Sequence, residues 1–293
     1  MIEWQTLLGD HPVTRPLREG RVSSPALHLA FADVPVPNQA FKRVVHDLEF
    51  DVAELALMTF LMARSRGVRL RLLPVVLLSR NPLQHLVCRA NYPFEPAELE
   101  GRRIGTRAYT TTTAIWARAL LADHFRVKLD GIEWVTYQES HVAGVTDPES
   151  VHCDAAHGDL LSLLLSGTID AAILDPVPRD PRLEAIVLDA DAAWKEWKRQ
   201  TGADTINHVV VVRESLAGDS SKMFELFRLF RDSGDVAEAE GAVRPAIGLT
   251  AMRRSLEAAI AAAEAQGLLA RPLAVDDLVT PEIAAAADGF NRG

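Results

Sequence analysis

The chain has 293 residues, 48% apolar and 24% charged, which is the composition of a globular protein with a substantial core. Its 31 basic and 40 acidic residues give a net charge of −9, so we expect neither a nucleic-acid nor an anionic-membrane surface. Two cysteines, Cys88 and Cys153, exclude a disulfide framework and a four-cysteine zinc site. The acidic balance still permits a local basic pocket for a small anionic ligand.

Short apolar strands alternate with amphipathic helices, which predicts an α/β fold. The expected strands, in chain order, are 4–8, 27–31, 50–55, 70–78, 84–88, 103–105, 133–135, 171–174 and 207–212. The expected helices are 41–48, 58–66, 111–125, 159–166 and a mostly helical tail from 223 that includes 256–266. The polar segments 9–15 and 151–159 are expected to be loops.

Two stretches of the sequence resemble each other. VVHDLEFDVAELAL (44–57) and LLLSGTIDAAILDP (163–176) each run from a helix end through a turn and an aspartate into a strand, with Asp51 and Asp170 at equivalent places. We interpret them as parts of two similar lobes, the alternative being the ordinary likeness of helix–turn–strand units. The predicted lobes are 1–82 with 207–293, and 83–206, joined by hinge strands beside a central ligand cleft.

The segment EGRRIGTRAYTTTTAIWAR (100–118) is the most informative part of the chain. Threonines are poor inside helices and good at helix N-termini, so a helix is expected to start there. Free backbone N–H groups at that start favour an anion such as a carboxylate, and Arg107 can add a bidentate contact. The candidate ligand-binding residues are Arg107, Thr110, Thr111 and Thr112. A plain capped helix with a solvent-facing arginine is the alternative.

A second group of candidates follows the first strand, in GDHPVTR (9–15), because ligands of α/β sheets bind beyond the carboxyl ends of strands. The candidates there are Asp10, His11, Thr14 and Arg15. Histidine titrates near neutral pH, which makes His11 a candidate proton donor. A polar surface turn is the alternative.

Glu54 lies within a predicted strand, where alternation places it on one face with Val52 and Ala56. A buried glutamate is costly unless it is paired, so it is expected to end the strand at the cleft or to pair with an arginine there. The other candidates are Thr59 at the next helix start, Glu139 and His141 in a loop after a strand, and Asn207 and His208 at the second crossover. For these a structural hydrogen bond is the alternative.

The stretch VHCDAAHGD (151–159) looks like a metal site, with His152, Cys153, Asp154, His157 and Asp159. Its spacing fits no zinc pattern with a second pair of ligands. A solvated loop before a helix, with Asp159 near the N-cap, is the preferred interpretation, and no metal is expected.

Five segments are informative together: FKRVVHDLEFDVAELALMTFLMARSRG, LEGRRIGTRAYTTTTAIWARALL, YQESHV, SGTIDAAI and INHVVVVRESL. With them the chain resembles the 4,5-dihydroxyphthalate decarboxylase family, over roughly residues 4–230. The first loop, GDHPVTR, departs from the family's GDYDRT pattern at His11 and Pro12. The resemblance implies an α/β, two-lobed type II periplasmic-binding-protein-like fold with a central ligand cleft.

The resemblance further implies a cofactor-independent decarboxylase acting on a small anionic aromatic substrate, a hydroxylated aromatic dicarboxylate. Ring-carbon protonation and CO2 loss then require a proton donor, either His11 or His141, oriented by Glu54 or Glu139. Arg107 with the threonine turn, and Arg15, are expected to hold the two acid groups.

Two other functions stay open on the sequence. One is a non-catalytic solute-binding protein for a small aromatic acid, and the other is a different enzyme on the same scaffold. The N-terminal residues, MIEWQTLLGDHPVTRPLREG, carry acids early and show no apolar run after a basic start. A cytoplasmic enzyme, with a homo-oligomer left open, is therefore the expectation.

Overall fold

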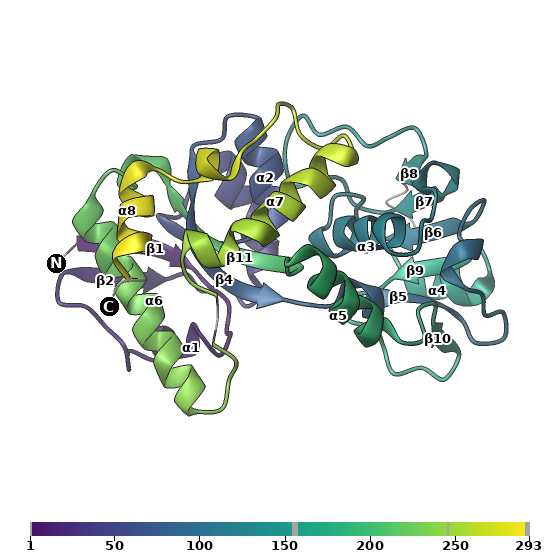
Figure 1. The fold of residues 1–293 in the computed structure, drawn as a ribbon, viewed down its shortest axis with the longest axis horizontal. Coiled ribbons are helices and arrows are strands. Elements are labelled where there is room, and N and C mark those ends of the chain that lie inside the picture. Colours follow the sequence, from purple (N-terminus) through teal and green to yellow (C-terminus); the bar gives the residue numbers. More distant parts are fainter. Residues whose placement is uncertain (1, 154–157, 245, 291–293) are drawn as a thin grey trace. The chain divides into compact units, whose positions relative to one another are not determined.

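The computed structural model describes residues 2–153, 158–244 and 246–290 (Figure 1). The chain forms two compact units, the first of which is discontinuous. Unit 1 comprises Met1–Ser79 and Ile206–Gly293, and unit 2 comprises Arg80–Thr205. The chain leaves unit 1 at the end of one strand and returns at the start of its neighbour in the same sheet. This arrangement explains why both passages of the chain between the units have a strand-forming sequence and no flexible linker.

Unit 1 is built on a five-stranded sheet of order β2-β1-β3-β11-β4. Its strands are β1 (Ile2–Leu7), β2 (Leu27–Phe31), β3 (Val52–Ala56), β4 (Leu70–Ser79) and β11 (Ile206–Arg213). Strands β2 and β3 run parallel to β1, whereas β11 is antiparallel to β3 and β4. The run of valines in β11 is fully buried, as expected for a central strand covered on both faces.

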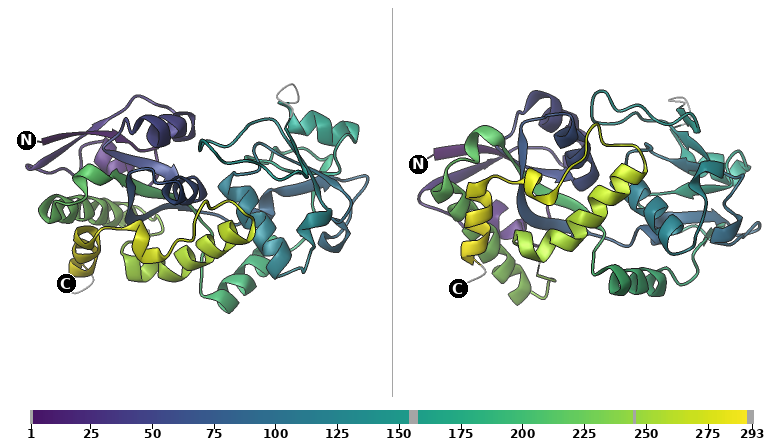
Figure 2. Two further views of the ribbon diagram at one scale, coloured as in Figure 1. Left: turned by 90° about the horizontal axis from the view of Figure 1, so that it is seen from above. Right: turned by 45° about the horizontal axis from the view of Figure 1, so that its top comes forward.

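The helices of unit 1 are α1 (Arg15–Arg18), α2 (Leu57–Ser65), α6 (Ser220–Ala239), α7 (Leu249–Ala265) and α8 (Pro281–Phe290). Helix α2 follows β3 directly and is buried along its whole length. Helices α6 and α8 pack side by side, as the green and yellow coils in both views of Figure 2 show. None of the helices in the described ranges is long and apolar enough to cross a membrane.

Unit 2 has a six-stranded sheet of order β10-β5-β9-β6-β7-β8. Its strands are β5 (Leu86–Arg89), β6 (Arg103–Thr106), β7 (Glu133–Thr136), β8 (Val151–Cys153), β9 (Ala171–Ile173) and β10 (Leu183–Ala185). Its helices are α3 (Thr112–Asp123), α4 (Leu160–Ser166) and α5 (Ala190–Thr201). Strands β7 and β9 flank β6 in parallel, and β5 is antiparallel to β9.

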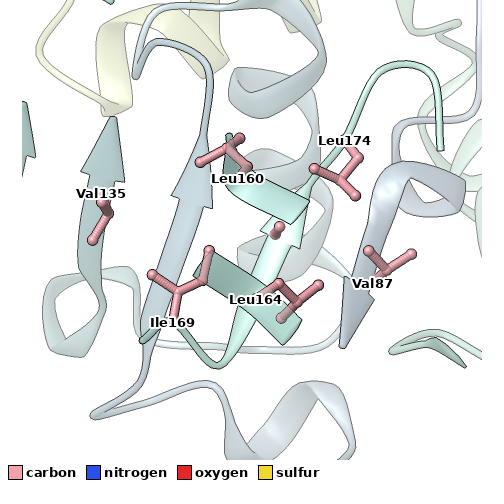
Figure 3. Close-up of a cluster of buried hydrophobic side chains, with 7 residues drawn as sticks. Val87, Val135, Leu160, Leu164, Ile169 and Leu174 are labelled. Atoms are coloured by element: carbon pink, nitrogen blue, oxygen red, sulfur yellow. The ribbon is translucent and has the colours of Figure 1, made fainter. Parts of the chain in front are cut away.

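Helix α4 packs against this sheet through a small apolar cluster (Figure 3). Leu160 and Leu164 of the helix contact Ile169 and side chains of the strands beneath them. A Cβ on Gly105 of β6 would lie 2.9 Å from Cδ2 of Leu160 in the helix and 2.6 Å from Cδ1 of Ile169, which follows the helix. Any larger residue at position 105 would therefore have to displace these two side chains.

The two units repeat the same local arrangement, as the sequence predicted. Asp51 directly precedes β3, donates its N–H to Gln5 O and accepts from Gln5 N at 2.9 Å. Asp170 directly precedes β9 and makes the same two bonds with Arg103, where the aspartate accepts at 3.0 Å. Each aspartate thus ties the start of one strand to the parallel strand beside it, and the sheets share the order of their central strands.

Several local predictions are wrong. Helix α1 begins at Arg15, where only a loop was expected, and residues 151–153 form the edge strand β8. Strand β10 and helix α5 were not anticipated. By contrast, residues 41–47 are helical, as predicted; the helix widens over Arg43–Asp47 and ends at Leu48, which adopts a left-handed conformation. Asp159 does cap α4 through its carboxylate, as predicted.

Candidate functional site

Three neighbouring strands of unit 1 bring one glutamate and two histidines together. Glu54 lies on β3, and on the adjacent strand β11 His208 pairs with Ala56. Directly paired residues share a face of the sheet, and so do residues two apart on one strand. Glu54 and His208 are therefore diagonal neighbours on one face. The β11–β4 register shifts on both sides of His208, an irregularity of the kind that re-aims side chains near functional sites.

His11 reaches the same glutamate from the loop after β1, on the other side of β3. The Thr14 hydroxyl holds this loop in shape: it accepts from His11 N at 2.9 Å and donates to Gly9 O at 2.5 Å. Thr14 is fully buried, so its hydroxyl is used to fold the loop around Glu54.

Glu54 is the centre of a tight hydrogen-bonded cluster that we call the His–Glu–His triad, formed by His11, Glu54 and His208. Nε2 of His11 lies 2.9 Å from both carboxylate oxygens, and Nδ1 of His208 lies 2.5 Å from Oε1. The Gly9 N–H donates to Oε2 at 2.8 Å. The Glu54 side chain is only 1% exposed, whereas the histidines are 19% and 18% exposed.

The protonation state of Glu54 follows from two opposing effects. Burial by itself raises the pKa of the Glu54 carboxyl, but hydrogen bonds from His11 and His208 and their charges outweigh it. The pKa of Glu54 therefore lies far below its usual range, and the group is a buried carboxylate. A carboxylate only accepts, so both histidines donate to it through the ring nitrogens that face it.

Gly9 and Phe41 shape the surroundings of the triad. A Cβ on Gly9 would lie 2.9 Å from Oε2 of Glu54 and 3.1 Å from Nε2 of His11, so any larger residue there would push these hydrogen-bonded groups aside. The Phe41 ring meets the His208 ring edge to face, with 5.6 Å between centroids. Sequence reasoning missed both residues. A glycine directly after a strand was the available signal for the first.

Of the two alternatives expected for Glu54, the pairing with an arginine is wrong, because both of its side-chain partners are histidines. Arg15 instead pairs with Asp10 at 2.9 Å, and both side chains are largely exposed. Thr59 and Asn207 are buried, in the first turn of α2 and next to His208. The structure thus gathers His11, Glu54 and His208, with Thr14 in support, while ligand contacts of Asp10, Arg15, Thr59 and Asn207 stay predictions.

In unit 2, Arg107 and the threonine turn follow β6, the counterpart of β1. Arg107 donates to Oε1 of Gln138 at 3.0 Å. Helix α3 starts at the threonines, as predicted, with Thr111 as its N-cap residue, although the Thr111 side chain makes no capping bond. Thr110 and Thr112 are buried. An anion site at this turn stays a prediction.

A fully buried arginine contacts the residue that precedes this turn. Nη2 of Arg118 donates to Tyr109 O at 2.7 Å, and the guanidinium lies 3.7 Å from the centroid of the Tyr109 ring. The Trp134 ring lies 5.0 Å away on the neighbouring strand β7. Burial lowers the pKa of Arg118 to about 10, which leaves it charged at neutral pH.

The remaining candidates of unit 2 follow β7 or lie on β8. Glu139 is exposed and His141 is half-buried in the loop after β7. His152 and Cys153 are exposed on β8, and His152 lies 3.6 Å from Glu133. Asp154 and His157 fall outside the described residues, so the stretch 151–159 gives no complete set of side chains to assess.

Comparison with curated proteins places this chain near one group of enzymes. A 4,5-dihydroxyphthalate decarboxylase of Comamonas testosteroni is 28% identical over 225 residues, which cover 72% of this chain and 68% of the relative. A second one, of Pseudomonas putida, is 25% identical over 207 residues, covering 66% and 80%. No protein-family model matches the chain.

Solved structures define the class of fold. A putative sulfonate-binding protein SsuA of Methylobacillus flagellatus KT has a TM-score of 0.55 at 12% identity, covering 100% of this chain and 95% of its own. An alkanesulfonate-binding SsuA of Xanthomonas axonopodis pv. citri scores 0.52 at 13% identity, covering 95% and 98%. The desulfurization enzyme DSZB scores 0.54 at 18% identity, covering 100% and 99%.

The chain therefore has a periplasmic-binding-protein-like fold of two α/β units, as expected. Within that class it resembles the 4,5-dihydroxyphthalate decarboxylases, and the resemblance read from the sequence is confirmed.

Proposed function

We propose that this protein is a decarboxylase of a hydroxylated aromatic acid, with a 4,5-dihydroxyphthalate-like dicarboxylate as its substrate. The observation that carries the proposal is the similarity to two decarboxylases over most of the chain. The His–Glu–His triad supports it, because it offers a histidine that can donate a proton and whose ring is hydrogen-bonded to a buried carboxylate. Protonation of an aromatic carbon requires such a group.

The reaction needs one proton transfer to carbon. A hydroxyl group para or ortho to the leaving carboxylate pushes electron density to the ring carbon that bears the carboxylate. An acid protonates that carbon, the carbon–carboxyl bond breaks, CO2 leaves, and the bonding electrons return to the ring. One C–H bond replaces one C–C bond, and the proton is replenished from solvent.

We assign the proton donor to His11 and its orientation to Glu54. The contact of 2.9 Å between His11 Nε2 and the carboxylate supports this assignment, since it fixes the ring and stabilises the imidazolium. Nδ1 of His11 is then the nitrogen that delivers the proton. The sequence left His141 and Glu139, in the loop after β7 of unit 2, as equal candidates.

Unit 2 contributes a proposal of its own, an anion site at Arg107 and the Thr110–Thr112 turn. The start of a twelve-residue helix and a nearby guanidinium support it. The variant Arg107→Ala tests this site through its affinity for aromatic acids, measured by calorimetry, and unchanged affinity would contradict it.

The experiment is a turnover assay with 4,5-dihydroxyphthalate and related hydroxybenzoates, following aromatic product and CO2. We expect turnover by the wild type and a loss of about 10²-fold or more in His11→Gln, the usual contribution of acid catalysis. The exposed His152→Gln variant is the matched control and should retain full activity.

Three outcomes would overturn parts of the proposal. No turnover on any of these acids, with thermal stabilisation by one of them, would identify a binding protein instead of an enzyme. Full activity of His11→Gln together with loss in His141→Ala would move the proton donor to unit 2. Full activity of Glu54→Gln would remove the triad from the mechanism.

A further inference from the structure

The triad has the composition and spacing of a divalent-metal site as well as those of a proton relay. In the described part of the chain, His11, Glu54 and His208 form a group whose ligand atoms all lie within 4.8 Å of one another. Two histidines and one glutamate are the protein ligands of a common open zinc site, in which the fourth position stays accessible.

The nitrogen and oxygen atoms of the triad lie closer together than the ligand atoms of a zinc site, because they share hydrogen-bonded protons. In a tetrahedral zinc site, bonds of about 2.1 Å place neighbouring ligand atoms about 3.4 Å apart. The observed contacts, 2.9 Å for His11 and 2.5 Å for His208, are shorter, so binding requires the histidines to move outward by less than about 1 Å. His11 lies on a loop, which makes such a shift feasible.

Two further features suit a metal. Nε2 of His11 faces the fork between both oxygens of Glu54, so one N–H is shared between two acceptors instead of pointing at one. The Gly9 N–H bonds to Oε2, which supplies the kind of outer hydrogen bond that orients metal-binding carboxylates.

A metal ion binds the lone pairs of the two ring nitrogens that face Glu54, so each nitrogen gives up its N–H proton, either to solvent or to the other nitrogen of its ring. The Glu54 carboxylate then contributes its negative charge to the cation.

We propose that the His–Glu–His triad binds one zinc-like divalent cation through His11 Nε2, the Glu54 carboxylate and His208 Nδ1, in place of the shared protons. The bound cation then competes with the proton relay. This site goes beyond the proposed function and does not depend on it, because binding is measured without substrate.

The test is calorimetric titration of tag-free, EDTA-treated protein with ZnCl2. We expect one equivalent per chain in the wild type and in the control His152→Gln. We expect at least about tenfold weaker binding in His208→Gln. Circular dichroism must show that His208→Gln is folded. Titration with Co2+ provides a second readout, since a tetrahedral site with nitrogen ligands gives visible absorption that His208→Gln should lose.

The outcomes separate this inference from the proposed function. No stoichiometric zinc binding, or equal binding by wild type and His208→Gln, overturns the metal site and leaves the decarboxylase assays untouched. If the protein is a decarboxylase, added zinc should lower its turnover and EDTA should restore it. Stoichiometric zinc binding at the triad without inhibition would overturn the competition between cation and proton.

Discussion

Replacement of Glu54 by glutamine tests whether the buried charge holds the site together. The amide supplies one oxygen and one NH2 group in place of two acceptors. Its oxygen must face the Gly9 N–H, because a backbone donor cannot change its role. Its NH2 group then faces Nδ1 of His208, which can accept only as a neutral ring. The variant therefore loses the charged contact to His208 and weakens the one to His11.

The expected cost follows from these contacts. Hydrogen bonds to a charged group contribute about 1.5–3 kcal/mol each, and the neutral amide recovers part of one while avoiding the burial of a charge. We expect the free energy of unfolding to fall by about 2–4 kcal/mol in Glu54→Gln.

Urea unfolding measures this change, and a matched surface glutamate provides the control. Glu133 also contacts an arginine and a histidine, at 3.1 Å and 3.6 Å, but its side chain is 42% exposed. Glu133→Gln should cost less than about 1 kcal/mol because water screens exposed pairs. Hydrogen exchange of the β3 and β11 amides should assign the loss to unit 1. Equal losses in the two variants would refute the reasoning.

Three further predictions concern packing and pH. Gly9→Ala should destabilise the protein by about 1–3 kcal/mol, because its Cβ meets Glu54 and His11. The control Gly218→Ala has open space around it and should be nearly neutral. Thermal unfolding compares the two variants. Gly105→Ala should also lower the free energy of unfolding by about 1–3 kcal/mol, since its Cβ meets Ile169. The protection of β6 and α4 amides against hydrogen exchange should fall. Unchanged protection would contradict the close approach. The pKa of Glu54 is lowered in the folded state, so its contribution should persist above about pH 4.3, the ordinary glutamate value, and decline as the pH falls further. The unfolding free energies of wild type and Glu54→Gln should therefore converge in acid, and a gap that widens there would contradict the sign.

The repeated turn–aspartate–strand pattern shows which features of the fold can be predicted from local sequence. The pattern of turn, aspartate and apolar strand was visible at Asp51 and Asp170, and the structure gives both the same backbone bonds. Such a pattern depends on neighbours in the chain and on strand periodicity, which sequence encodes directly. The same reasoning placed most strands and singled out Glu54 as a buried acid in need of a partner.

Which partner Glu54 takes was decided by tertiary structure. His208 is 154 residues away and His11 is 43 residues away, and the choice depends on which strands adjoin β3 and in what register. A shift by one residue would turn His208 to the other face of the sheet. Sequence by itself singled out Glu54 as a buried acid, and His11 and His208 as separate candidates. Only the pairing of β1, β3 and β11 determined that they meet, because register is set by the packing of the whole sheet.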